Sequence, residues 1–120
     1  MKNFYELHID SQLSSSDPID RILNVNTDKR SDGRWCYTIT QEKGEPYYDF
    51  INNFLDLLDG KYEQLLDLKI TKDDIAIWHI YIHDGQCNLE FDPQRMKRLG
   101  DAGITLCISC YQDENIDYSN

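Results

Sequence analysis

The sequence predicts an α+β domain, in which a five-stranded mixed sheet carries its helices on one face and leaves the other face at least partly open. Three observations lead to this class. Several short segments alternate between apolar and polar residues, which is typical of half-buried strands. Other segments place apolar residues at helical spacing, and two of them begin with the dipeptide Asp-Pro. These two segments each lie between strands, so the expected order is β-α-β-α-β-β-α-β.

The N-terminal half contains two expected strands and one short helix. Residues 4–10 and 34–40 alternate between apolar and polar side chains, so both are expected to be strands. Between them, Asp17-Pro18 suits the start of a helix, because proline fits the first helical position, where no N–H group is needed. The polar, turn-rich residues 24–33 are expected to form a loop.

The longest expected helix covers residues 47–59. Gly60 ends or kinks it, because glycine readily adopts the left-handed conformation that follows many helices, and residues 61–68 add one or two further turns. The apolar side chains of the long helix form a wide face that can cover a sheet. They are Phe50, Ile51, Phe54, Leu55, Leu57 and Leu58.

Asp84-Gly85 is typical of a two-residue β-hairpin turn, here between residues 75–83 and 86–91. In that register the side chains of the two strands sort into an apolar face and a polar face. The apolar face, which we expect to cover the core, comprises Trp78, Ile80, Ile82, Cys87, Leu89 and Phe91. The polar face comprises His79, Tyr81, His83, Gln86, Asn88 and Glu90.

The last helix and strand follow the hairpin. Asp92-Pro93 suits a helix start, Gly103 suits its end, and residues 104–111 alternate as a strand does. Right-handed crossovers tend to place such helices on one face of the sheet. The expected open face carries Glu6, His8, Cys36, Thr38, His79, Tyr81, Asn88, Glu90, Cys107, Ser109 and Tyr111.

The composition favours a single cytoplasmic domain. The chain has 120 residues, with 12 basic and 22 acidic side chains and a net charge of −10. We expect residues 1–112 to form the domain and residues 113–120 to be an acidic tail. Strong negative charge opposes binding to nucleic acid or anionic membranes and favours a basic protein partner. No signal-peptide pattern or membrane-length apolar stretch is present, and all four cysteines fall in expected strands, as reduced thiols would.

The long helix and its extension carry an acidic stripe. Asp49, Asp56, Asp59 and Glu63 recur at spacings that place them on one side. Such a stripe is often only the solvated face of an amphipathic helix. Because no basic residues accompany these carboxylates at matching spacing, however, they repel one another, and a basic protein partner would relieve that repulsion.

Two patterns that resemble redox or metal sites are excluded by strand geometry. Cys107 and Cys110 form a C-x-x-C pair, but residues three apart in a strand point to opposite faces. His79 and His83 share a strand face but lie roughly 13 Å apart, too far for one metal ion to bridge. We therefore assign no metal ligand, no cofactor and no catalytic residue.

A small-molecule-binding protein or a thiol-dependent enzyme is the alternative function. Cys107 could act as a nucleophile with His79 as its base if both lie on the open face. Glu90, expected opposite His79, could orient the imidazole and raise its pKa. No oxyanion-hole loop is recognisable in the sequence, which weighs against catalysis.

Several segments resemble a bacterial family of small proteins, the domain-of-unknown-function family 4279. The segments are GQCNLEF and GITLCISCY, together with the DPIDRIL helix, the WCYTI strand and the IW-x-IYI strand. The resemblance covers most of the chain and implies a bacterial, cytosolic α/β domain. It implies no established activity or catalytic residue, but members of this kind resemble immunity proteins of toxin–immunity loci.

We expect a non-enzymatic protein-interaction module, in its most concrete form an immunity protein that neutralises a cognate basic toxin. Nucleic acid and membranes are not expected partners. The protein is expected to be a monomer or a homodimer paired through the open face. The candidate binding residues are His79, Tyr81, Asn88, Glu90, Cys107, Asp49, Asp56, Asp59 and Glu63.

Overall fold

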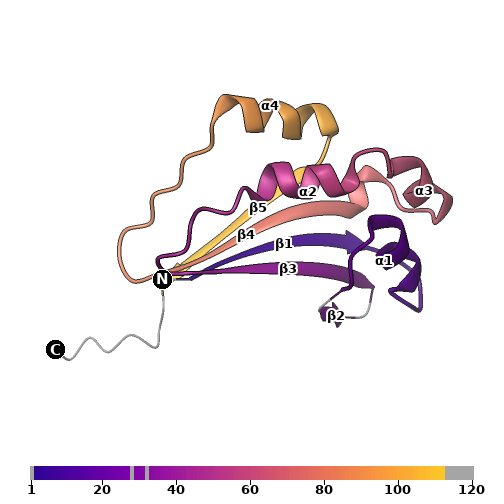
Figure 1. Cartoon of the computed structure of the whole chain (residues 1–120), viewed down its shortest axis with the longest axis horizontal. Helices are drawn as coiled ribbons and strands as arrows, with labels where there is room; N and C mark the ends of the chain where they lie inside the picture. The colour runs from indigo at the N-terminus through magenta and orange to yellow at the C-terminus, as the bar shows by residue number, and fades with distance from the viewer. Residues whose placement is uncertain (1, 28, 32, 113–120) are drawn as a thin grey trace.

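The computed structural model describes residues 2–27, 29–31 and 33–112 (Figure 1). The acidic tail expected at residues 113–120 lies outside this part of the chain. In order, the elements are β1 Lys2–Asp10, α1 Asp17–Leu23, β2 Lys29–Ser31, β3 Arg34–Glu42, α2 Phe50–Leu58, α3 Tyr62–Asp67, the 3₁₀ turn η1 Lys72–Asp74, β4 Ile75–His83, α4 Pro93–Ala102 and β5 Thr105–Gln112.

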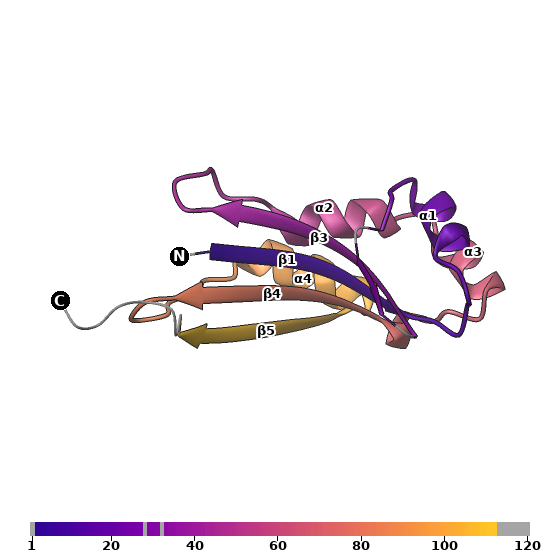
Figure 2. The same cartoon turned by 90° about the horizontal axis from the view of Figure 1, so that it is seen from below.

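The strands form one mixed sheet in the order β2-β3-β1-β4-β5. The central strand β1 is antiparallel to both β3 and β4, and β5 is parallel to β4. Helices α2 and α4 lie over one face of this sheet, and α1 and α3 lie towards one end (Figure 1). Seen from below, the strands lie in front of α2 and α4 (Figure 2). The α+β class, the mixed sheet and the one-sided helix layer are confirmed.

The predicted hairpin after Asp84-Gly85 is wrong. Residues 86–91 form no strand, and the chain instead continues through α4 to β5, which pairs with β4 in parallel. One edge of β4 is paired with β1 and the other with β5, so neither edge is left for a hairpin partner. The sheet therefore has four long strands, all of them predicted, and gains only the three-residue β2 from a segment expected to be a loop.

The predicted faces of β4 are also wrong. Ile77 and His79 are 0% and 5% exposed and face the helices, whereas Ile80 and its even-numbered neighbours face away from them and are partly exposed. The physical reason is that both faces of β4 carry large apolar side chains, because Ile75 and Ile77 alternate with Trp78 and Ile80. Only the predicted hairpin register indicated which face of β4 is buried, and that hairpin does not form.

The strand registers define the face that no helix covers, here called the open face. Its confirmed members are Glu6, His8, Cys36, Thr38, Cys107, Ser109 and Tyr111. Of the other residues expected there, His79 and Tyr81 lie on the helix-covered side, and Asn88 and Glu90 lie in the segment between β4 and α4. Phe4, Trp78, Ile80 and Ile82 take their place on the open face.

The core lies between the sheet and the helices. On the sheet side, β1 contributes Tyr5, Leu7 and Ile9, each at most 2% exposed. The apolar side of α2 covers them, as its sequence predicts: Phe50, Ile51, Phe54, Leu55 and Leu58 are all buried. Each fully buried Leu, Ile or Phe side chain stabilises the fold by roughly 1.5–3 kcal/mol relative to an exposed one.

The expected starts and ends of α4 are confirmed. The Asp92 carboxylate caps the helix by accepting the N–H of Arg95, and Pro93 is the first helical residue. Gly103 ends the helix with a φ of 71°, a left-handed conformation that costs glycine little. Within the described residues, no helix is long and apolar enough to cross a membrane.

Candidate functional site

Three of the candidate binding residues come together at one pocket. His79, Asn88 and Glu90 all line a cavity of about 200 Å³ on the helix-covered side of the sheet. The segments that precede α2 and α4 fold over the ends of β1 and β4 and supply two of its walls. The remaining lining residues are Asn3, Tyr5, Gln41, Tyr47, Phe50, Leu89 and Phe91.

His79 is the most deeply placed polar side chain of this pocket. Its ring packs against the rings of Tyr5 and Phe50, with centroid distances of 4.8 and 5.3 Å, and these two rings stack on each other at 4.7 Å. Burial lowers the pKa of His79 to about 4, because a buried imidazole cannot easily carry charge. The ring is therefore neutral at pH 7. Its Nε2 lies 2.7 Å from Asn3 Oδ1, an acceptor, which makes Nε2 the donor and Nδ1 a bare acceptor.

The predicted partnership of His79 with Glu90 is not a cross-strand pair. Residues 86–91 are not in the sheet, and His79 bonds Asn3 on β1 instead. Glu90 is exposed at the mouth of the same pocket, so its carboxylate can accept hydrogen bonds from a bound ligand. The pocket thus combines aromatic walls with amide, imidazole and carboxylate groups, which suits a small planar molecule with hydrogen-bonding edges.

The predicted thiol–imidazole pair is wrong. Cys107 lies opposite Trp78 in the β4–β5 register, whereas His79 lies opposite Ile108. Successive residues of a strand point to opposite faces, so the sheet separates the Cys107 thiol from the His79 imidazole. The same alternation confirms that Cys107 and Cys110 diverge and form no redox pair.

Cys110 instead lies beside Cys87. The two sulfur atoms are 3.0 Å apart, although Cys87 belongs to the segment between β4 and α4 and Cys110 to β5. The contact with Cys87 raises the pKa of the Cys110 thiol. Both thiols are at least partly exposed, so an oxidant can reach them. This pair could not be predicted from the sequence, because Cys87 was expected on a strand that does not form.

Two of the four carboxylates of the acidic stripe are paired with arginines of α4. Arg95 binds both carboxylate oxygens of Asp49, with Nε–Oδ1 and Nη2–Oδ2 distances of 2.9 and 3.0 Å. This pairing holds the pKa of Asp49 at about 2. Arg98 Nη2 donates one hydrogen bond to Asp56 Oδ1 at 2.6 Å. The expectation that the stripe has no basic partner is therefore wrong, because the partners come from a second helix.

The rest of the stripe consists of Asp59, which follows α2, and Glu63 on α3, and both are exposed. Two unshielded carboxylates offer much less to a basic protein than the four expected. The stripe is therefore a weaker candidate than the sheet for the main binding surface.

The open face of the sheet carries an apolar cluster. Phe4 lies opposite Ile80, and Ile82 lies opposite Tyr111, so the side chains are neighbours across three adjacent strands. Trp78 adjoins them on β4. Tyr111 is 49% exposed and the other four are partly exposed. We call these five residues the apolar cluster.

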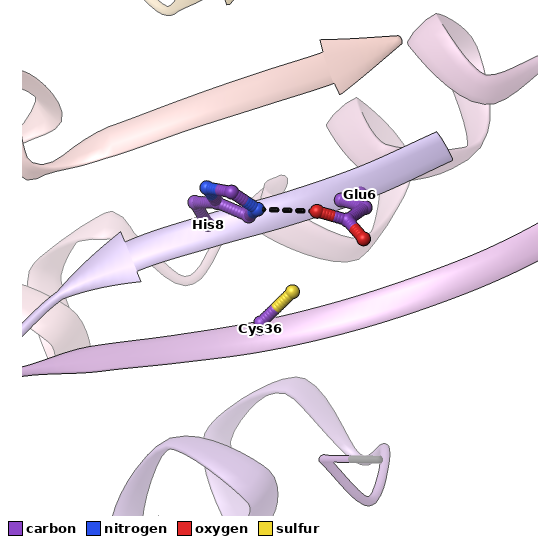
Figure 3. Close-up of side chains that lie close together, drawn as sticks. All are labelled: Glu6, His8 and Cys36. Atoms are coloured by element: carbon purple, nitrogen blue, oxygen red, sulfur yellow. Dashed lines mark hydrogen bonds and ion pairs between the residues drawn. The ribbon is translucent and has the colours of Figure 1, made fainter. Parts of the chain in front are cut away.

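A polar cluster lies next to it on the same face (Figure 3). His8 lies directly opposite Cys36 in the β1–β3 register, and Glu6 points the same way two residues before His8. His8 Nε2 is 2.7 Å from Glu6 Oε1. The hydroxyl of Thr38 donates to Glu6 Oε2 at 3.2 Å and lies 3.5 Å from Cys36 Sγ. The sequence placed all four residues on the open face, but only the pairing of β1 with β3 brings them together.

The fold and these surfaces define a mixed α+β domain with a one-sided sheet. No family model, curated protein or solved structure matches the chain. The resemblance to the domain-of-unknown-function family 4279 stays a prediction.

We expect diamide to join Cys87 and Cys110 in an intramolecular disulfide. The two thiols lose two hydrogens to the diazene, which becomes a hydrazine, and one S–S bond of about 2.05 Å forms. Only about 1 Å of approach is needed from the observed 3.0 Å. Non-reducing peptide mapping by mass spectrometry measures the linkage.

Cys107→Ser is the matched control, because Cys107 is on the same strand as Cys110 but faces the other way. This variant should form the bond as the parent does, and Cys87→Ser should not. Unreacted thiols at both positions, or a bond from Cys110 to Cys107, would contradict the observed path of the chain after β4.

Proposed function

We propose that the protein is a non-enzymatic binding module that docks a basic protein on the open face of its sheet. The observation that carries this proposal is the apolar cluster of Phe4, Trp78, Ile80, Ile82 and Tyr111. Its side chains are partly exposed on paired strands, and no described helix covers them. Contiguous apolar surface of this kind marks interaction sites in proteins.

The chemistry of the apolar cluster suits a protein partner. Tryptophan and tyrosine dominate binding energy at interfaces because they bury a large area with little loss of conformational freedom. Here Trp78 and Tyr111 stand beside aliphatic side chains on a rigid sheet. Such a preorganised surface loses little entropy when a partner docks.

The net charge supports a basic partner. A charge of −10 attracts a positively charged protein over long range and accelerates its association at low ionic strength. The two exposed carboxylates of the acidic stripe add to this attraction. The apolar cluster then supplies the short-range affinity, because charges at an interface rim contribute mainly to association rate and specificity.

The concrete form of the proposal is toxin neutralisation. An immunity protein must bind one toxin tightly and needs no catalytic group of its own. The apolar cluster on the open face of a rigid sheet, in a strongly acidic chain, meets both requirements. The resemblance to the family described above supports this form, and the open face supplies a surface for it.

We expect the substitution Ile80→Glu to abolish partner capture. The test uses tagged full-length protein and a lysate of its source, with capture at low salt and elution at high salt. Ile80→Glu places a charge in the apolar cluster, and burying that charge at an interface weakens binding at least about tenfold. Leu66→Glu is the matched control, because Leu66 is 58% exposed on α3, in the helix layer.

The proposal predicts one basic protein that the parent and Leu66→Glu retain and Ile80→Glu loses. That protein should also be toxic when produced alone and harmless when co-produced with the parent chain. Equal capture by all three proteins would exclude the open face. Self-association of the parent, lost in Ile80→Glu, would make a second copy of this chain the occupant instead.

Small-molecule binding is the second candidate function, and the pocket around His79 favours it. Its volume of about 200 Å³ is below the roughly 300–1,000 Å³ of drug-sized sites, so it suits a fragment such as a nitrogen heterocycle. The exposed Glu90 carboxylate offers acceptors to its N–H groups.

We expect a planar nitrogen heterocycle to raise the melting temperature of the parent protein in a thermal-shift series of purines, pyrimidines and pyridine carboxamides. The shift should shrink in Tyr47→Ala, because Tyr47 forms an exposed wall of the pocket. Leu66→Ala, outside the pocket, is the control and should keep the shift. A shift that Tyr47→Ala leaves unchanged would place the ligand elsewhere.

A further inference from the structure

We propose that Glu6, His8 and Cys36 form a binding site for a divalent transition-metal ion, with zinc as the best match. A carboxylate oxygen, an imidazole nitrogen and a thiol sulfur are the three kinds of side-chain ligand that zinc takes in proteins. One of each is present here, and the three ligand atoms lie within 4.8 Å of one another. The site goes beyond the proposed function and does not depend on it.

The separations of the ligand atoms fit a tetrahedral ion. Zinc binds nitrogen and oxygen at about 2.0–2.2 Å and sulfur at about 2.3 Å, so neighbouring ligands lie roughly 3.3–3.7 Å apart. His8 Nε2 and Glu6 Oε1 are 2.7 Å apart, and all three ligand atoms lie within 4.8 Å of one another. These values bracket the required ones. Side-chain rotations that move the ligand atoms by about 1 Å reach that geometry.

The backbone holds the three residues in place. Glu6 and His8 are on the central strand β1, which is paired along both edges, and Cys36 is on its neighbour β3. Ligands on paired strands are held more precisely in position than ligands on loops. Thr38 contacts both the Cys36 sulfur and the Glu6 carboxylate, so it can orient two ligands from outside the site.

The proposed metal site is mostly buried, but it remains accessible to solvent or to a bound protein partner. The side chains of Glu6 and His8 are only 14% and 13% exposed, and Cys36 is 7% exposed. The ring of Trp78 borders the site, 5.4 Å from the His8 ring. All four lie on the open face, so an ion has an entry path. Burial of the ligands from water strengthens the attraction between a cation and these ligands.

His8 is not fully satisfied by the protein. Its Nε2 contacts Glu6, but its Nδ1 is buried and has no hydrogen-bond partner in the described part of the chain. A buried nitrogen without a partner indicates a missing ligand or a second ring orientation, and among the described residues the Nδ1 atoms of His79 and His83 are in the same state.

The ligand set selects the class of ion. A thiolate and an imidazole favour zinc, cobalt or copper over magnesium and calcium, which prefer oxygen ligands alone. The Cys36 thiol loses its proton to solvent when it binds the ion. Three protein ligands leave a fourth position on a tetrahedral ion, directed to the open face, where water or a partner side chain can bind.

We expect cobalt(II), added alone to the chelator-treated full chain under a phosphine reductant, to give a thiolate-to-cobalt absorption band in the near ultraviolet. One equivalent of zinc should remove the band by displacing cobalt. Cys36→Ser and His8→Gln should each weaken cobalt binding at least tenfold. Cys107→Ser is the matched control, because Cys107 lies on the same open face without a neighbouring His and carboxylate among the described ligand groups, and it should bind as the parent does.

A parent protein without the band, or equal loss of the band in Cys107→Ser and Cys36→Ser, would overturn the site. Glu6→Gln keeps the size and hydrogen-bonding capacity of the side chain, so it tests the site if the other variants fold poorly. It should weaken binding while its far-ultraviolet circular dichroism matches that of the parent. Unchanged binding in folded Glu6→Gln would remove the carboxylate from the proposed ligand set.

Discussion

The double pairing of β4 is the constraint on which the rest of the structure depends. Because β1 occupies one edge and β5 the other, the chain that leaves β4 cannot turn back as a hairpin and must cross the helix layer through α4. That crossing carries residues 84–92 over the end of the sheet. It thereby builds the pocket around His79 and brings Cys87 to Cys110. It also settles which side of β4 is buried.

The sequence predicts those features that depend on local chemistry. The cap by Asp92, the stop at Gly103 and the buried side of α2 follow from spacing and turn preference alone, and each is confirmed. Pairings between distant segments could not be predicted in this way. The Asp49–Arg95 contact joins two helices through tertiary packing, and the faces of β4 are both apolar. The Asp84-Gly85 dipeptide favours a hairpin turn, and the predicted faces of β4 rested on that turn. The prediction was wrong because the pairing of β4 with β1 and β5 outweighs the local turn preference.

The corrected faces change the functional interpretation. Once Trp78 and Ile80 are placed outside, the open face is no longer a polar surface but an apolar cluster beside a polar cluster of Glu6, His8 and Cys36. The proposed partner surface, on β1, β4 and β5, therefore adjoins the proposed metal site, on β1 and β3. An ion with an open fourth position beside an apolar docking surface could be contacted by the bound partner. The helix-covered side, by contrast, holds the core and the small pocket around His79.

The stability cost of two neighbouring substitutions on β4 tests the central claim most directly. Ile77 is fully buried against the helices, so Ile77→Ala should lower the free energy of unfolding by roughly 2–5 kcal/mol in urea denaturation. Ile80→Ala, on the open face, should lower it by less than about 1 kcal/mol. The reverse order, with Ile80→Ala the more damaging, would show that the open face is the buried one and would contradict the fold, the partner surface and the metal site together.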